Sequence, residues 1–522
     1  MKRALVILAL AACGDDGNPL EVKIDTGVIV GVDQMGVRAW LGVPYAAPPV
    51  GDLRWKRPER AAPWDAPFDA VQTGIQCPQT FSIGGPGGSE DCLFVNVWSP
   101  RGAKQRPVMV WLHGGAFIFG SGGDSYYSGR HLAETFDVVV VTVNYRLGAL
   151  GFMAHPALTG EDPAYRSSGN YGLEDQHAAL EWVQRNIEQF GGDKAKVLLF
   201  GESAGGFSTC AHYVSPASAG LFHAAIAESG LCGSKIEEPT LAIAEAAGLK
   251  TGEKLGCPGT GPSVAACMRA KSMDELLDAT EITPPNMQPP GGPFYVGGEN
   301  VLSTIPNVDG VVMPTSLRAA FTAGNFEKRP LILGTNRDEG TLFHSSFFAM
   351  EVTNETEYRA AIERRFGAAN VDAILAHYPL ANFPTPNRAI AEVTGDAFFV
   401  CPTRHSARGA ARAGAPIYLY SFDRVPEQAF LADLGVFHSM EIPFVFGTDG
   451  TFPLGFAGAS GAPVADAVQQ MWTRFAETGE PGPAWPRYDE AGDQFLKIDA
   501  PVSTGVALKA APCTFWDSLA LP

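Results

Sequence analysis

The chain has 522 residues, of which 46% are apolar and 18% are charged. This composition excludes collagen, coiled coils and a largely disordered chain, because it supplies enough apolar side chains for a large buried core. The formal net charge of −18 argues against nucleic acid as a partner, since a phosphate backbone would be repelled.

The first residues predict an export signal. The basic start Met1-Lys2-Arg3 precedes nine apolar residues, 4–12, which are too few to span a bilayer but fit a signal peptide. Leu10-Ala11-Ala12-Cys13 also resembles the lipobox of bacterial lipoproteins, which implies cleavage before Cys13 and a lipid anchor on that cysteine. An ordinary cleaved signal peptide is the alternative. Gly14 resembles lipoproteins sent to the outer membrane, so we expect a protein of the bacterial cell envelope, periplasmic or at the surface, or a secreted one.

Short apolar runs alternate with longer helical patterns along the rest of the chain. This alternation predicts a mostly parallel sheet covered by helices on both faces. The predicted strands are 108–112, 138–143, 197–200, 224–227, 331–333 and 417–420. Helices are predicted at 174–190 and 464–476, where apolar residues recur every three or four positions. The proline-rich segment 283–293 is interpreted as a long surface loop rather than a linker, because strand and helix patterns continue beyond it.

A possible nucleophile lies at Gly201-Glu202-Ser203-Ala204-Gly205. A G-x-S-x-G match alone can be a simple turn, but here it follows the predicted strand 197–200 and precedes a plausible helix that begins at 206–210. A strand, a sharp turn and a helix in this order form a nucleophile elbow. The helix N-terminus would direct amide dipoles at the negative charge that develops when Ser203 attacks a carbonyl.

A serine hydroxyl is a weak nucleophile at neutral pH, so the site also needs a base, an orienting acid and an anion hole. His113-Gly114-Gly115-Ala116 follows the strand 108–112 and matches the loop that supplies oxyanion-hole amides. With the amide of Ala204, this loop would present three donors. The alternative is that this Gly-Gly sequence forms only a turn and binds no oxyanion.

Position in the chain leaves the acid and the base less certain. The acidic pair Asp338-Glu339 follows the predicted strand 331–333, and ligand-facing loops lie at the carboxyl ends of such strands. Position favours His438 only modestly among the histidines that come after this pair, which are His344, His377, His405 and His438.

Eight cysteines follow Cys13, and an even number favours disulfides in an exported protein, although about 105 pairings are open. Spacing suggests two local staples, Cys77 with Cys92 and Cys257 with Cys267, and a long loop between Cys401 and Cys513. Cys210 and Cys232 are then left over. They can pair or stay as buried thiols, and we favour thiols slightly, because a free cysteine packs well as a small hydrophobe.

From about residue 22 to its end the chain resembles the type-B carboxylesterase family, which includes cholinesterases, mammalian carboxylesterases and bacterial para-nitrobenzyl esterases. The matching stretches are 42–51, 89–93, 113–116, 144–148, 201–206, 338–340 and 435–447. The resemblance implies an α/β-hydrolase fold, with a large mostly parallel central sheet and helices on both faces. We accordingly expect a signal peptide over 1–12, a short tether over 13–21 and a single domain over 22–522.

The resemblance also implies a role for individual residues. It makes Ser203 the nucleophile, His438 the base and Glu339, rather than Asp338, the acid. The implied oxyanion donors are the amides of Gly115, Ala116 and Ala204. Glu202 and Glu441 would be supporting carboxylates near the base, unless they are only buried ion-pair partners. The implied disulfides are Cys77–Cys92, Cys257–Cys267 and Cys401–Cys513, and no metal or organic cofactor is implied.

The predicted activity is hydrolysis of small-molecule carboxylic esters through an acyl-serine intermediate. In cholinesterases the loop inside the first disulfide is long and brings a tryptophan to the choline site, whereas 78–91 contains no tryptophan. Without such an aromatic cage we expect uncharged esters to be preferred to choline esters. A triacylglycerol lipase is the alternative enzyme. A non-catalytic binding protein of the same fold is the alternative from another class, although such proteins lack the serine.

Overall fold

The computed structural model of the chain describes residues 18–80, 87–235, 238–280, 302–345, 351–448 and 458–521. The predicted signal peptide 1–12, Cys13 and the predicted loop 283–293 lie outside these residues. The strand β1 (Glu21–Ile24) begins at the last residue of the predicted tether. It forms a three-stranded sheet with β2 (Gly27–Val30) and β5 (Phe68–Asp69).

Within the described residues, the main sheet has 11 strands. In spatial order they are β14 (Ser503–Val506), β13 (Gln494–Ile498), β12 (Ile417–Phe422), β11 (Leu331–Asn336), β10 (Ala224–Glu228), β9 (Gly192–Glu202), β7 (Arg106–Leu112), β8 (Val139–Val143), β6 (Phe94–Pro100), β4 (Val37–Pro44) and β3 (Val32–Gln34). Neighbours from β13 to β8 pair in parallel, and antiparallel pairs occur only towards the two ends of this sheet. The predicted mostly parallel sheet is confirmed, and each predicted strand overlaps one of its central strands.

Both faces of the sheet are buried. Successive side chains of a strand point to opposite faces of the sheet, so each strand contributes to two cores. In β7, Val108, Val110 and Leu112 belong to one core, and Met109 and Trp111 belong to the other. The first core includes side chains of α4 (Tyr171–Asn186), α5 (Ala204–Val214), α10 (Leu317–Ala323) and α14 (Cys401–Arg412). The second includes side chains of α1 (Arg130–Phe136), α15 (Ile442–Phe446) and α16 (Gly458–Thr478). The sheet is therefore the middle of three layers.

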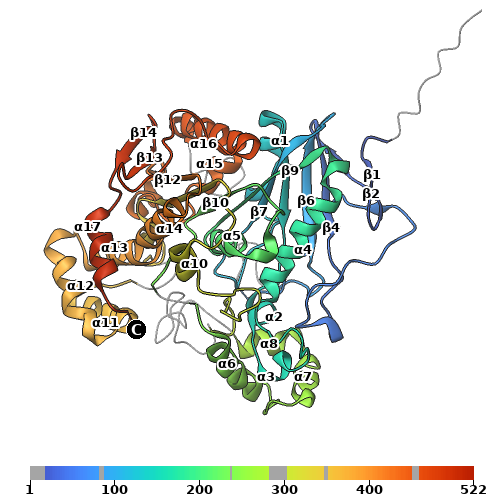
Figure 1. Cartoon of the computed structure of the whole chain (residues 1–522), viewed down its shortest axis with the longest axis horizontal. Helices are drawn as coiled ribbons and strands as arrows, with labels where there is room; N and C mark the ends of the chain where they lie inside the picture. Colours follow the sequence, from blue (N-terminus) through green and yellow to red (C-terminus); the bar gives the residue numbers. More distant parts are fainter. Residues whose placement is uncertain are drawn as a thin grey trace, which may run out of the picture.

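Two smaller helical groups lie outside this core, one at the left of Figure 1 and one at its lower edge. One group contains α11 (Glu355–Phe366), α12 (Val371–His377) and α13 (Pro386–Thr394), packed with the C-terminal helix α17 (Ala510–Ser518). The other contains α6 (Leu241–Lys254), α7 (Pro262–Arg269) and α8 (Met273–Ala279). Two further short α-helices of the described residues are α2 (Gly148–Phe152) and α3 (Pro156–Thr159). No helix in the part of the chain that the structure describes is long and apolar enough to cross a membrane.

Candidate active site

Ser203 occupies a sharp turn between β9 and α5. Its backbone has φ 58° and ψ −120°, a conformation that costs energy for a residue with a side chain and that clusters at functional sites. The glycines on either side are sterically required, because a Cβ on Gly201 would lie 2.6 Å from the carbonyl oxygen of Leu112, and one on Gly205 only 1.9 Å from the same atom. The turn is anchored by a 2.9 Å hydrogen bond from the Ser203 amide to the carbonyl oxygen of Glu228. The predicted strand, turn and helix are thus present.

The loop that follows β7 lies directly beside this turn. A Cβ on Gly114 would be 3.1 Å from the Cβ of Ser203. Gly115 has φ +103°, and a Cβ there would lie 2.0 Å from the carbonyl oxygen of Phe119, so only glycine fits. Ala116 and Phe117 also have positive φ values, 52° and 64°. Among the hydrogen bonds of the described residues, none is donated by the amides of Gly115 or Ala116, so both donors are available to a ligand.

His113, the first residue of this loop, holds the loop in place. Its ring stacks on Tyr145, with ring centroids 4.4 Å apart, and its Nδ1 donates to the carbonyl oxygen of Gly114 at 2.8 Å. The Tyr145 hydroxyl donates to the carbonyl oxygen of His113 at 2.7 Å. Burial lowers the pKa of His113 to about 4, so the ring is neutral at physiological pH. It fixes the loop.

Glu339 and His438 form a close buried pair. The Nδ1–H of His438 donates to Oε2 of Glu339 at 2.6 Å. The other carboxylate oxygen, Oε1, accepts hydrogen bonds from the Ser229 hydroxyl at 2.5 Å and from the Asn336 amide at 2.7 Å. Both oxygens of Glu339 are therefore engaged, which fixes the carboxylate and the ring that it orients.

Asp338, the other half of the acidic pair, points elsewhere. Its Oδ2 accepts a 2.8 Å hydrogen bond from the amide of Val436 and pairs with Arg337 at 2.8 Å. A Cβ on Gly435 would lie 2.4 Å from the same oxygen, so the loop that leads to His438 is packed against Asp338. Asp338 holds this loop, whereas Glu339 contacts the imidazole.

The free edge of His438 faces the turn that carries Ser203. Its Nε2 lies 3.1 Å from Oε1 of Glu202, but the two atoms are not aligned as a hydrogen bond. Ser439, the next residue, donates from its hydroxyl to the same oxygen of Glu202 at 2.6 Å. Nε2 makes no hydrogen bond within the described ranges, to Ser203 or to any other group. The hydrogen bond between a catalytic serine and its base is often long before substrate is bound.

The charges around His438 decide its protonation. Burial alone would lower the pKa of the ring, but the carboxylates of Glu202 and Glu339 outweigh that effect and raise the pKa above its usual value. The rings of Phe343 and Phe399 lie against the imidazole, with centroids 5.0 and 4.8 Å away. The carboxylates of Glu339 and Glu202, one near each ring nitrogen, and the two apolar rings hold the imidazole in a single orientation.

More buried carboxylates lie beneath the pair. Glu441 accepts a 2.5 Å hydrogen bond from the side-chain amide of Asn336, and Glu228 accepts one of 2.8 Å from the indole of Trp472. Burial raises the pKa of Glu202, of Glu441 and, to about 8, of Glu228. Sequence reasoning missed Glu228, Ser229 and Asn336. All three lie at or just beyond the carboxyl ends of β10 and β11, which is the signal that could have found them.

Four disulfides are present in the described residues. The three implied pairs are confirmed, as Cys77–Cys92, Cys257–Cys267 and Cys401–Cys513. The expectation of free thiols at Cys210 and Cys232 is wrong, because these residues form the fourth disulfide. α5 and the segment after β10 bring the two Cα atoms to 5.9 Å, which lies within the normal range for a disulfide.

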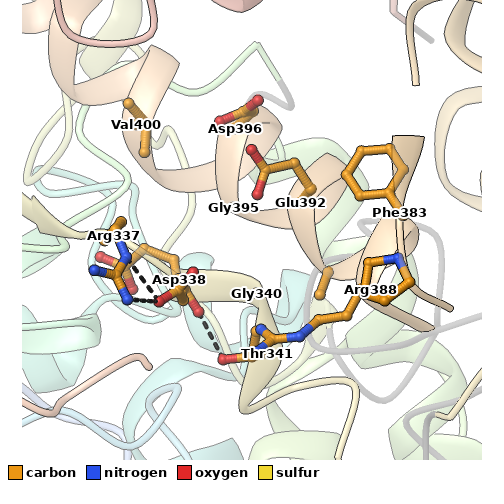
Figure 2. Close-up of a pocket in the computed structure, with 13 residues that line it drawn as sticks. Arg337, Asp338, Gly340, Thr341, Phe383, Arg388, Glu392, Gly395, Asp396 and Val400 are labelled. Atoms are coloured by element: carbon orange, nitrogen blue, oxygen red, sulfur yellow. Dashed lines mark hydrogen bonds and ion pairs between the residues drawn. The ribbon is translucent and has the colours of Figure 1, made fainter. Parts of the chain in front are cut away.

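A small cavity of about 170 Å³ is lined in part by residues 337–341, the segment that carries Glu339. Figure 2 shows it between the turn at 338–341 and the helical residues around Glu392 and Asp396. Arg388 extends across it towards Thr341, and Asp338 faces Arg337. In the part of the chain that the structure describes, no group of three or more His, Cys, Asp or Glu side chains is arranged to hold a metal ion.

A strained serine after a parallel strand, beside a glycine-rich loop and a buried histidine–glutamate pair, defines an α/β hydrolase of the serine-esterase type. The carboxylesterase family model matches residues 18–516, and the chain belongs to that family. It is similar to a para-nitrobenzyl esterase of Bacillus subtilis (strain 168), with 35% identity over 497 residues that cover 92% of this chain and 95% of that protein.

Other relatives differ in the substrate that their names state. A fumonisin B1 esterase of Sphingopyxis macrogoltabida is 35% identical over 97% of this chain and 91% of its own length. An acetylcholinesterase of Bungarus fasciatus is 32% identical over 95% of this chain and 86% of its own length. A solved structure of a PNB esterase superposes with a TM-score of 0.82 at 33% identity, covering 96% of this chain and all of that one. The protein is a carboxylic ester hydrolase with the α/β-hydrolase fold.

Proposed function

We propose that the protein hydrolyses uncharged carboxylic esters through a Ser203–His438–Glu339 triad and an acyl-serine intermediate. The contact that carries this proposal is the 2.6 Å hydrogen bond between His438 Nδ1 and Glu339 Oε2. It leaves Nε2 of the same ring on the side of Glu202, the residue that precedes Ser203. A ring held in this way can accept a proton at Nε2 while its Nδ1–H stays bonded to the carboxylate.

In the acylation step, His438 takes the proton of Ser203 as Oγ attacks the ester carbonyl. The carbonyl oxygen becomes an oxyanion, and the amides of Gly115, Ala116 and Ala204 bind it. The close approach of Gly114 to Ser203 supports this assignment, because the glycine-rich loop lies next to the Cβ of Ser203. Loss of one such donor typically costs about 2.7–4 kcal/mol of transition-state stabilisation.

The same groups complete the reaction. His438 returns its proton to the alkoxide leaving group, so that the alcohol departs and an acyl-Ser203 ester remains. A water molecule then gives a proton to Nε2 and attacks the acyl carbonyl, and His438 passes this proton to Oγ of Ser203 as the carboxylic acid and the free serine are released. Glu339 stays ionised throughout and stabilises the imidazolium that forms twice in each turnover.

The nucleophile is tested by an organophosphonate ester, which forms a stable tetrahedral adduct on an activated serine. We expect one adduct per chain, mapped by mass spectrometry to the peptide that contains Ser203. The matched control is Ser208→Ala, which removes another serine of α5 and should leave labelling intact, whereas Ser203→Ala should abolish it. An adduct on a different residue would refute the proposed triad.

Preference for uncharged esters is supported by the short Cys77–Cys92 loop, which has a separation of 15 residues and no tryptophan. Acetylcholine and its neutral isostere 3,3-dimethylbutyl acetate differ only in the charged nitrogen. We expect the neutral ester to have the higher kcat/KM. A quaternary ammonium gains about 0.5–2 kcal/mol from each aromatic face that it contacts, and without an aromatic cage acetylcholine loses this gain. A higher kcat/KM for acetylcholine would show that a cation site exists elsewhere.

We also propose that the chain is exported and lipid-anchored at Cys13 in the cell envelope. Four disulfides support export, since such bonds persist in oxidising compartments. Labelled palmitate should enter the protein in a bacterial host, and Cys13→Ala should prevent incorporation. If the label enters the Cys13→Ala variant equally, the anchor is not on this residue.

A further inference from the structure

The first turn of α5 packs against the segment after β10 with no side chains between them. A Cβ on Gly230 would lie 2.6 Å from the carbonyl carbon of Gly206, and one on Gly206 would lie 2.8 Å from the Cα of Gly230. Two backbones can approach this closely only because both residues are glycine. Such a contact buries little apolar surface, so packing alone holds the two segments together weakly.

The last residue of β10 and the segment after it, 229–232, nevertheless carry two contacts on which the proposed triad depends. The carbonyl oxygen of Glu228 accepts the 2.9 Å hydrogen bond from the Ser203 amide, and the Ser229 hydroxyl donates to Glu339 at 2.5 Å. Ser229 and Leu231 have φ values of 50° and 53°. Residues with side chains pay a conformational cost in this region, so the segment keeps its shape only if its surroundings hold it.

The Cys210–Cys232 disulfide lies where the segment needs this restraint. Cys210 is on α5, two helical turns after Ser203, and Cys232 directly follows Leu231. Both cysteines are buried, with 0% and 1% of their surfaces exposed. Sγ of Cys232 lies 3.7 Å from the carbonyl oxygen of Gly206, beside the glycine contact. The bond therefore joins the helix that begins at the proposed nucleophile to the segment that supports the proposed acid.

We propose that the Cys210–Cys232 disulfide is a positioning group for catalysis, which keeps Ser229 on Glu339 and Glu228 on the turn at Ser203. The proposal rests on the proposed function, because it assigns the disulfide to that triad. The disulfide takes no part in proton transfer. It acts by limiting how far α5 and the strained segment can separate, and a misplacement of about 1 Å in a catalytic site can cost about 10²-fold in rate.

The test compares two variants that each lack one disulfide. Cys210→Ala/Cys232→Ala removes the proposed positioning group, and Cys257→Ala/Cys267→Ala removes a bond between the end of α6 and α7, away from the triad. Rates with para-nitrophenyl acetate are divided by the number of sites titrated with a phosphonate. We expect kcat of the first variant to fall about 10- to 100-fold with KM within about 2-fold, and the control to match the wild type. A first variant with wild-type kcat, or an equal fall in both, would overturn the proposal.

The pH profile separates positioning from general loss of structure. If the disulfide holds Glu339 through Ser229, its removal should lower the pKa of His438, which sets the fall of the rate at acidic pH. The ring then loses part of the effect of Glu339, whereas the effect of Glu202 remains. A second readout is a double-mutant cycle with Ser229→Ala, in which the two effects should not add, because both act through one contact. Additive effects with an unchanged pH profile would contradict the assignment.

The outcome also has to be separated from a failure of the proposed function. If wild-type protein carries no phosphonate on Ser203, the triad itself is wrong, whereas labelled wild type with an unaffected double variant contradicts only the role of the disulfide. Should the alanine variant not fold, Cys210→Ser/Cys232→Ser removes the same bond with side chains closer in size to cysteine and leaves the other three disulfides in place. If that variant is also unfolded, the bond is required for the whole fold, and the positioning role is refuted.

Discussion

At the scale of single residues, the site depends on how carboxylates surround one imidazole. His438 contacts Glu339 through Nδ1 at 2.6 Å, and Glu202 approaches Nε2 at 3.1 Å. Glu339 is fixed by two further hydrogen bonds, and Glu202 by the Ser439 hydroxyl. The two carboxylates together raise the pKa of the ring in spite of its burial. In the proposed mechanism, this arrangement gives a base that is strong enough to accept the serine proton yet held in place.

The pH dependence follows from the raised pKa. Only the neutral ring can accept a proton, so kcat/KM should fall as the pH drops through a value above about 6.5, the ordinary pKa of histidine. In Glu202→Gln the ring loses one of the carboxylates that raise its pKa, and the midpoint should move to lower pH. Profiles of kcat/KM for an uncharged ester between about pH 5 and 9 would show this. A midpoint that stays unchanged or rises in the variant contradicts the assigned electrostatics.

The acidic pair provides a second comparison. Glu339→Gln removes the carboxylate that orients His438, and we expect kcat to fall by about 10²–10⁴-fold, as for other triads whose acid becomes an amide. Asp338→Asn is the matched control, since it changes an adjacent acid that holds the Val436 amide instead. It should lower kcat far less. Steady-state kinetics of both variants give the two values of kcat. A larger loss of kcat in Asp338→Asn than in Glu339→Gln would mean that Asp338, and not Glu339, is the acid that orients His438.

Prediction from sequence at this scale reached Ser203 from its motif, but position left the base and acid open. Neither spacing nor composition shows which of two adjacent acids turns inward, because this depends on the loop at 435–438 that Asp338 supports. The resemblance to a family supplied Glu339 and His438. Glu228 and Ser229 were missed because no motif marks them, although they follow a predicted strand.

At the scale of elements, glycine contacts hold the turn and α5 against the sheet. Gly205→Ala would place a Cβ 1.9 Å from the carbonyl oxygen of Leu112, which must displace α5 from β7. We expect the free energy of unfolding to fall by about 1–3 kcal/mol, as for other overpacked interiors, together with a loss of activity. Denaturant unfolding would measure it.

Gly261→Ala is the control for this prediction. Gly261 has φ −82°, and a Cβ there would have no heavy atom within 4 Å. Its stability and activity should be close to those of the wild type. If both variants unfold at the same denaturant concentration, α5 is not packed as closely as described.

The central strands could be predicted because parallel strands covered on both faces are continuous apolar runs. The strands towards the ends of the sheet were not predicted. β6 is buried but interrupted by Asn96 and Ser99, and β13 is partly exposed, so neither gives a long apolar run. The pairing of Cys210 with Cys232 was also missed, because burial is equally consistent with a thiol, and sequence does not show that α5 approaches the segment after β10.

At the scale of the whole molecule, long-range contacts assemble one site from distant parts of the chain. The Glu339–His438 contact joins residues 99 apart, and the hydrogen bond from Ser229 to Glu339 joins residues 110 apart. All of them lie at or beyond the carboxyl ends of neighbouring parallel strands, where the order of the sheet brings them together. The sheet therefore brings separate motifs together in one site.

The central claim is that one hydroxyl, that of Ser203, becomes acylated in each turnover. Rapid mixing of the enzyme with para-nitrophenyl acetate measures this directly, as a burst of nitrophenol released before the steady state. We expect a burst of about one equivalent per chain in the wild type and none in Ser203→Ala, whose kcat should be reduced by about 10⁴-fold or more while its fold is retained. A burst of normal size in Ser203→Ala would contradict the central claim.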